Sequence, residues 1–336
     1  MSSRQRIEYI DAMRGFTMIL VVYSHICGFC LGDTTMGFNS VFFLFRLPCF
    51  FLISGWLFEP TAAEKPFWQV VRKKMMVQLV PTFIFLLILA PPPLFFSRLG
   101  ATKGGYWFTF ALFEFFVLYL LSVRVGRRWT GLLAVVISAA AFCYDVLYNR
   151  YFASLGMIAR LLGFLSFMAW RYYLFFYLGT LVRRHFDDFL KLTDRPLVRV
   201  AVVAGFCGVA LLPLTELLLP SFLVFALGGM LGATMVFTFF RTTAAALTQE
   251  HWPGRALQYV GRRTLDIYLL HYFFLPRFLI AYGDSLRAFD SRLLELVVGL
   301  VLSLLVVGAC LAVSWLVRLS PFLGHYLFGV NYERRS

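Results

Sequence analysis

The chain has 336 residues, of which 60% are hydrophobic, 18% are aromatic and only 14% are charged. Soluble globular domains carry about 25% charged residues, so this composition excludes that class and indicates a polytopic membrane protein. A net charge of +14 would suggest a nucleic-acid partner for a soluble protein. In this chain the distribution of the basic residues gives another cause, and no nucleic acid is expected.

Ten apolar stretches follow one another along the chain and predict an all-α polytopic membrane helical bundle with about ten transmembrane helices. Several are shorter than the ~20 residues with which a helix crosses a bilayer. The first has the basic flank of a signal peptide but no small-residue cleavage site after it, so we expect it to be retained. The stretches cover residues 16–31, 38–58, 75–96, 106–123, 130–147, 170–182, 200–218, 222–240, 264–282 and 293–317.

Lys and Arg gather in every second loop between these stretches. Most of the 31 basic residues lie in the loops on the side of the N-terminus. The positive-inside rule places such loops in the cytoplasm. We therefore expect a multi-pass protein with both termini in the cytoplasm and an even number of crossings.

An arginine and a histidine share one stripe of the first predicted helix. Arg14 and His25 are eleven residues apart, and eleven steps of ~100° end only ~20° past three full turns, about 16 Å further along the axis. Ionisable side chains in hydrocarbon are costly and mark functional sites by default. Taken alone, Arg14 is more simply a membrane-edge anchor and His25 a core histidine. The presence of both on one stripe favours a functional site. Asp11 either pairs with Arg14 or caps the helix.

The second predicted span contains Arg46, at a depth within reach of His25. A guanidinium is not readily neutralised, so Arg46 must meet a carboxylate, a carbonyl or an anionic substrate group. Cys27 and Cys30 spread around the helix that carries His25, which makes a poor metal site, and no metal is expected. The six cysteines form no disulfide framework.

Four motifs occur in order along the chain: IDAMRG leading into R-x10-H at Arg14 and His25, FRLPCFFLISG at 45–55, YWF at 106–108 with Glu114, and GRRTLDIYLLH at 261–271. Together they resemble the integral-membrane acyltransferase-3 family of bacterial O-acyltransferases. The resemblance covers nearly the whole chain and implies a single acyltransferase domain over residues 1–336 in the bacterial inner (cytoplasmic) membrane. It also implies a cytoplasmic acyl-CoA donor and a sugar of a cell-envelope glycan as acceptor.

Residues 59–74 are expected to form a basic interfacial segment on the cytoplasmic side, within an amphipathic stretch at 64–78. Arg72, Lys73 and Lys74 either contact the phosphates of coenzyme A or bind anionic lipid headgroups, the simpler interpretation. Pro91 to Pro93 end the third span and predict an outward turn, because no helix continues through three prolines.

The fourth span places Glu114 near mid-membrane, seven residues after Trp107. A carboxylate at that depth needs a cationic partner such as Arg46 or His25. Glu114 is therefore either half of a structural ion pair or a catalytic partner. The resemblance implies a Trp-led motif here, with Trp107 as a substrate-binding candidate, although the spacing to Glu114 departs from the commonest version.

Residues 148–171 are apolar but interrupted by Arg150 and Arg160, and they are too long for a plain loop. They predict an outer re-entrant or interfacial segment that covers an acceptor site. In the ninth span His271 is a second-tier candidate for substrate binding. Arg277, near the outer end of that span, is either a lipid-edge anchor or an acceptor contact.

The predicted reaction moves an acetyl or other short acyl group from acyl-CoA, acetyl-CoA in the first place, to a hydroxyl of a cell-envelope or exopolysaccharide sugar. A sugar hydroxyl needs a base, which His25 can supply. Arg46 or Glu114 would orient His25 or the acceptor, and the resemblance implies Arg14 near the coenzyme A phosphates.

Further expected partners are membrane lipids, a lipid-linked sugar, and a separate protein or a second copy of this chain. The competing class is a transporter or flippase of a sugar or lipid-linked sugar, in which the buried charges form a substrate or proton path.

Overall fold

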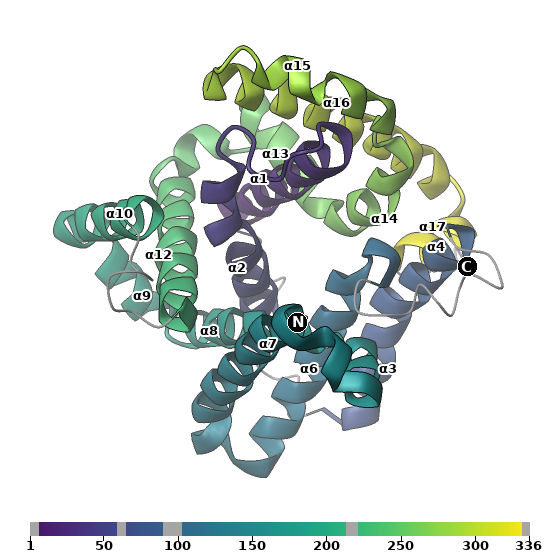
Figure 1. Ribbon diagram of the computed structural model, residues 1–336. Helices are drawn as coiled ribbons and strands as arrows, with labels where there is room; N and C mark the ends of the chain where they lie inside the picture. The colour runs from purple at the N-terminus through teal and green to yellow at the C-terminus, as the bar shows by residue number, and fades with distance from the viewer. Residues whose placement is uncertain (1–6, 59–64, 90–102, 213–220, 331–336) are drawn as a thin grey trace. The chain divides into compact units, whose positions relative to one another are not determined.

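Helices make up nearly all of the computed structural model, which describes residues 7–58, 65–89, 103–212 and 221–330 (Figure 1). No strand occurs within these ranges, so the predicted all-α fold is confirmed. The turn predicted at Pro91 to Pro93 and the beginning of the interfacial segment predicted at 59–74 lie outside the described residues.

The helices group into two compact units, each assembled from two stretches of the chain. Unit 1 takes Met1–Ile53 and Asp187–Leu316, and unit 2 takes Ser54–Phe186 and Val317–Ser336. The boundaries cross α2 (Asn39–Leu57) and α16 (Arg292–Arg318). Unit 1 also contains α1 (Glu8–His25), α9 (Phe186–Thr193), α10 (Pro196–Leu211), α12 (Ser221–Thr242), α13 (Trp252–Arg262), α14 (Thr264–Phe274) and α15 (Gly283–Arg287). Unit 2 contains α3 (Phe67–Lys74), α4 (Val80–Leu89), α6 (Trp107–Gly126), α7 (Thr130–Phe164), α8 (Tyr173–Arg184) and α17 (Pro321–Phe328).

Each of the ten apolar stretches coincides with a helix over all or part of its length, but fewer helices are long and apolar enough to cross a membrane. Five candidates occur among the described residues: Glu8–Cys30, Asn39–Trp56, Trp107–Leu147, Ser221–Thr242 and Arg292–Arg318. A sixth arises if Thr264–Phe274 and Arg277–Arg287, bent by 65°, count as one span. The 12 residues of α8 are only about 18 Å long. The predicted number of ten spans is therefore not confirmed.

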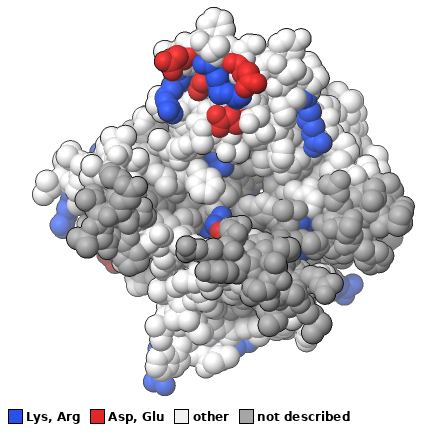
Figure 2. All heavy atoms as spheres, in the orientation of Figure 1, with Lys and Arg blue, Asp and Glu red and all other residues white. Residues whose placement is uncertain are grey.

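The surface of these helices suits a lipid environment. Large apolar side chains are more than half exposed along α16, among them Leu293, Leu304, Leu305 and Leu316. Exposed apolar surface of this extent needs an apolar partner. In Figure 2 charged side chains gather mainly over α15 and the start of α16, and most of the rest of the visible described face is uncharged.

Within unit 1, α13 and α14 follow one another with Arg263 between them, and α13 lies beside α1 (Figure 1). The contacts show that the two stretches run in the same direction, because the residue numbers of the contacting pairs increase together. Gln258 contacts Glu8, Gly261 lies against Asp11 and Gly15, Thr264 contacts Arg14, and His271 contacts His25. Residues about 250 positions apart in the sequence are thereby held in register.

The closest approach between these stretches is at Gly15 and Gly261. A Cβ atom at Gly15 would meet the backbone carbonyl of Leu257, and one at Gly261 would meet the carbonyl of Asp11. Small residues at a membrane helix interface let two backbones come this near. The two glycines therefore set the separation of α1 from α13 and of the side chains further along.

The segment predicted at 148–171 begins inside a long helix. The 35 residues of α7 would extend about 52 Å, more than the ~30 Å hydrocarbon core of a bilayer. After Ser166, which has a positive φ of 51°, the chain forms a short helix at Phe167–Tyr172 that packs back on α7. The placement of 148–171 relative to the membrane stays a prediction.

Replacing Gly261 with alanine should lower the midpoint of thermal unfolding in detergent by several degrees. The added methyl group has no room beside the carbonyl of Asp11, and overpacking costs about 1–3 kcal/mol. Gly308→Ala is the matched control, because nothing lies within 4 Å of a Cβ at Gly308. Alanine is the better helix former by about 1 kcal/mol, so the control should be neutral or stabilised. Equal midpoints for the two variants would contradict the close contact.

Candidate active site

Two histidines from distant parts of the chain meet in unit 1. Nδ1 of His25 on α1 lies 2.8 Å from Nε2 of His271 on α14, at hydrogen-bonding distance. The two rings are inclined by only 9°, with centroids 4.9 Å apart. His271 is fully buried, and its Nδ1 lies 3.1 Å from the carbonyl oxygen of Ile267. His25 is half-buried, so it is the member of the pair that another molecule can reach.

Both helices become irregular at this histidine pair. His25 ends α1, and residues Ile26–Cys30 continue it as one π-helical turn, a feature that is frequent at functional sites. Shortly after His271, α14 ends at Phe274, and Pro276 precedes a 3₁₀ turn at Arg277–Tyr282. Irregular backbone at membrane depth is tolerated where it is buried in protein or lines a cavity. The local sequence thus interrupts two helices at the same place.

Aromatic rings and one arginine surround the half-buried His25. The ring centroids of Phe29 and Tyr272 lie 5.6 and 5.2 Å from that of His25. The guanidinium of Arg277 is exposed and lies 6.0 Å from the centroid of Phe29. The structure therefore brings the predicted residue Arg277 to the surroundings of His25.

Arg14 lies on the same side of α1 as His25 but nearer the N-terminal end of the helix. Its Nη2 donates a hydrogen bond of 3.0 Å to Oγ1 of Thr264, the first residue of α14. Its Nη1 lies 3.7 Å from Oδ1 of Asp11, so Asp11 pairs with Arg14, which is one of the two roles expected for Asp11. The Arg14 side chain keeps 23% of its surface exposed, so a ligand can still reach it.

Arg46 on α2 is buried, as its place in the second predicted span requires. Its Nη1 donates a hydrogen bond of 2.6 Å to the side-chain carbonyl of Asn39, and its guanidinium lies 5.3 Å from the ring of Phe43. A carbonyl was one of the partners expected for this arginine. Arg46 also lies within electrostatic reach of His25.

Glu114 belongs to a separate polar cluster in unit 2. Its Oε2 accepts a hydrogen bond of 2.7 Å from the indole nitrogen of Trp170. Lys103 lies within electrostatic reach of Glu114 and donates to the carbonyl of Phe164 at 2.6 Å. Burial lowers the pKa of Lys103 to about 8, and the charge of Glu114 opposes that shift. Trp170 and Lys103, which the sequence did not single out, are thus the partners found for Glu114 within unit 2.

Trp107 also contributes to unit 2. Its ring lies nearly parallel to that of Tyr172, with 6.3 Å between centroids and 23° between planes. The neighbouring Arg171 forms an ion pair with Asp145 on α7. Trp107 therefore stands at the junction of α6 with the short helix that follows α7.

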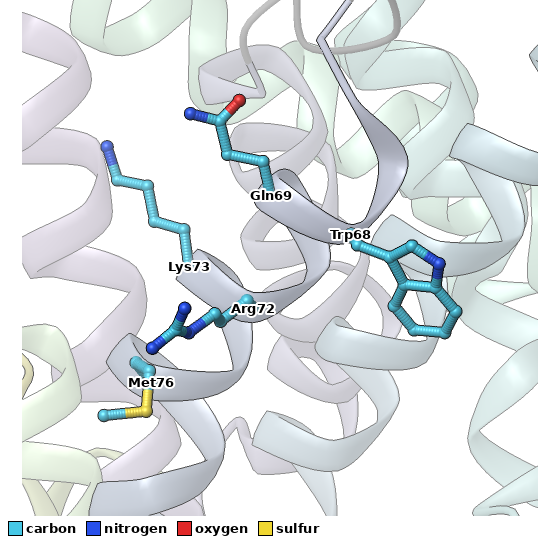
Figure 3. A pocket seen from close by; sticks show the side chains of 5 residues that line it. All are labelled: Trp68, Gln69, Arg72, Lys73 and Met76. Atoms are coloured by element: carbon cyan, nitrogen blue, oxygen red, sulfur yellow. The ribbon is translucent and has the colours of Figure 1, made fainter.

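The basic segment of unit 2 is helical, as the amphipathic pattern predicted. Trp68, Gln69, Arg72, Lys73 and Met76 line an open hollow of about 440 Å³ (Figure 3). In Figure 3 the side chains of Gln69 and Lys73 extend in the same direction from successive turns. Lys74 takes another direction, because its Nζ lies 3.9 Å from the centroid of Phe116. Only two of the three basic residues therefore line the hollow.

All six cysteines are free thiols. Within the part of the chain that the structure describes, no group of three or more His, Cys, Asp or Glu side chains is arranged to hold a metal ion. Cys27 and Cys30 are buried near His25, whereas Cys143 and Cys207 are exposed.

Sequence reasoning assigned residues to both clusters but did not find the contact between His25 and His271. One signal was present: Thr264 and His271 are seven residues apart, close to two full turns, and so share a stripe of α14. That stripe faces the one formed by Arg14 and His25. The π-helical turn after His25 has no comparable signal in the sequence.

Comparisons with known proteins identify the family of this chain. A family model described as an acyltransferase domain, acyltransferase-3, matches residues 7–318. Nodulation protein NolL of Mesorhizobium japonicum is 24% identical over 188 residues, which is 48% of this chain and 50% of that protein. The chain thus spans about half the length of this curated relative. No solved structure matches the chain. Because the family model covers nearly all of the sequence, the protein belongs to the acyltransferase-3 family.

Proposed function

We propose that this enzyme transfers an acetyl or other short acyl group from cytoplasmic acyl-CoA to a hydroxyl of a cell-envelope or exopolysaccharide sugar. The observation that carries the proposal is the half-buried imidazole of His25, held at Nδ1 by His271 and aligned along α1 with Arg14. A base in the interior and a fixed cation nearer the helix start suit a reaction whose two substrates arrive from opposite sides of a membrane.

His25 acts as the general base. As the acceptor hydroxyl attacks the thioester carbonyl carbon, its proton passes to Nε2 of His25, and a new ester C–O bond forms. The C–S bond then breaks, and the coenzyme A thiolate takes the proton back from His25. The products are the acylated sugar and free coenzyme A. Arg46 and Arg277, which both lie near His25, orient the acceptor. Glu114 and Trp107 are the candidate catalytic and substrate-binding residues of unit 2, considered by itself.

The donor approaches from the side of Arg14. A guanidinium is a good partner for the phosphates of coenzyme A, and Arg14 is partly exposed. In unit 2, Arg72 and Lys73 in the hollow on α3, together with Lys74, are further candidates for contacts with coenzyme A phosphates. The acyl-bearing arm covers the axial distance of about 16 Å from Arg14 to His25.

The orientation in the inner membrane is supported by two independent features. Basic residues concentrate in the loops on the side of the N-terminus, which supports a cytoplasmic location of both termini. In addition, α1 and α14 run in the same direction, as the first and ninth predicted spans must, because an odd number of spans lies between them. A lipid-linked sugar, a separate protein or a second copy of this chain would deliver the acceptor from the other side.

His25→Ala should reduce acyl transfer by at least about 100-fold, because a positioned general base contributes that much or more. The measurement uses purified protein, acetyl-CoA labelled in the acetyl group and a glycan extract, with covalent label on the glycan as readout. His185→Ala is the control, since His185 is exposed on the surface. Undiminished labelling by folded His25→Ala protein would reject the base, and sugar movement across vesicles without labelling would support a transporter.

Arg14→Ala should raise the KM for acyl-CoA more than that for the acceptor, by roughly 10-fold if one phosphate contact of about 1.4 kcal/mol is lost. Thr264→Val separates binding from structure, because it removes the hydrogen bond to Arg14 and leaves the charge in place. A donor site predicts a small effect of Thr264→Val on the KM for acyl-CoA. Equal increases in both KM values for Arg14→Ala would indicate a purely structural arginine.

Neutralising the hollow on α3 tests the second group of donor contacts. The double variant Arg72→Gln with Lys73→Gln should raise the KM for acyl-CoA several-fold at low salt and less at high salt, because exposed charges are screened. Lys74→Gln should have the smaller effect, since Lys74 lies over Phe116 outside the hollow. If the double variant changes only binding to anionic lipid vesicles, the hollow is a membrane contact.

A further inference from the structure

The contact between the two histidines has a direction that the backbone determines. The chain of hydrogen bonds begins at the carbonyl oxygen of Ile267, which lies 3.1 Å from Nδ1 of His271. A carbonyl oxygen can only accept, so Nδ1 of His271 carries a proton and donates it. A neutral imidazole has one N–H group, and therefore Nε2 of His271 is an acceptor.

The same reasoning applies to the ring of His25. Nε2 of His271 lies 2.8 Å from Nδ1 of His25, and since the first is an acceptor, the second must be the donor. Nδ1 of His25 then carries the proton of the neutral ring, and the lone pair is left on Nε2. Among the described residues no hydrogen bond engages Nε2 of His25, and the half-buried ring leaves it open to a ligand.

The hydrogen-bond chain also tolerates the proton that a base must take up. When Nε2 of His25 gains a proton, Nδ1 remains a donor and neither ring has to turn. A proton on Nε2 of His271 would instead make this N–H group point at the N–H group on Nδ1 of His25, with the two nitrogens only 2.8 Å apart. The added proton is therefore confined to the outer nitrogen of His25, which can also return it.

We propose that His271 is a positioning residue: by accepting from Nδ1 of His25 it fixes the tautomer and the ring orientation that present Nε2 to the acceptor hydroxyl. This replaces the substrate-binding role first considered for His271, because a fully buried side chain that already uses both ring nitrogens has no group to offer a substrate. The catalytic consequence rests on the proposed function, whereas the tautomer does not.

The tautomer is measured directly by nitrogen NMR on the full-length protein labelled with ¹⁵N-histidine, at a pH where both rings are neutral. The chain has five histidines, and the signals of His25 and His271 are assigned by their loss in His25→Gln and His271→Gln. Both rings should show a protonated Nδ1 and a bare Nε2. A protonated Nε2 on neutral His25 in the wild-type protein would overturn the proposal, whether or not acyl transfer is observed.

Two variants test the consequence for catalysis. The amide oxygen of His271→Gln reaches about the position of Nε2 and can accept from His25, whereas His271→Leu offers no acceptor. We expect kcat to fall less than about 10-fold for glutamine and roughly 100-fold or more for leucine, with the KM values nearly unchanged. His25 should keep its protonated Nδ1 in the glutamine variant and lose that preference in the leucine variant.

A purely structural histidine predicts a different pattern. Losses of kcat that follow the midpoint of thermal unfolding, and are equal for glutamine and leucine at equal stability, would overturn the positioning role. If the wild-type protein shows the expected tautomer but transfers no acyl group, the proposed function fails and the hydrogen-bond direction stands. The exposed residue His185, changed to glutamine, provides the control for both readouts.

Discussion

Backbone contact at Gly15 and Gly261 fixes how α13 and α14 lie against α1, and the candidate site depends on that register. Neither glycine has a side chain to pack, so the two backbones approach until atoms of one helix meet carbonyl groups of the other. From that point onward the two stretches run together, which brings Thr264 to Arg14 and, further along, His271 to His25. A change in the separation at the glycines is therefore transmitted to the histidine pair.

The ionisable side chains in the apolar helices have defined partners, as their desolvation cost requires. Arg14 is bound by Asp11 and Thr264, Arg46 donates to Asn39, and Glu114 accepts from Trp170. His25 differs, because the hydrogen bond to His271 uses only one of its two ring nitrogens. A histidine that is held on one side and open on the other has the properties of a base, and the π-helical turn beside it gives the backbone an irregular course at the same point.

The division of the chain into two units places the proposed contacts in two groups. His25, His271, Arg14, Arg46 and Arg277 belong to unit 1, and Glu114, Trp107 and the basic residues of α3 belong to unit 2. The histidine pair is complete within unit 1, so the proposed chemistry of the base needs no side chain from unit 2. Unit 2 contains two further candidate regions, the hollow on α3 and the polar cluster around Glu114.

The sequence by itself determined the all-α membrane class, the family, the positions of the helices and the shared stripe of Arg14 and His25, because apolar run length and the 3.6-residue period are local properties. It did not determine how many helices cross the membrane, since short helices such as α8 and the bent pair of α14 with the segment Arg277–Arg287 depend on their neighbours. It also missed the partner of His25, although Thr264 and His271 share a stripe of their own. Only the tertiary structure decided that pairing, because residues 246 positions apart meet through the packing of two helices, which no local spacing specifies.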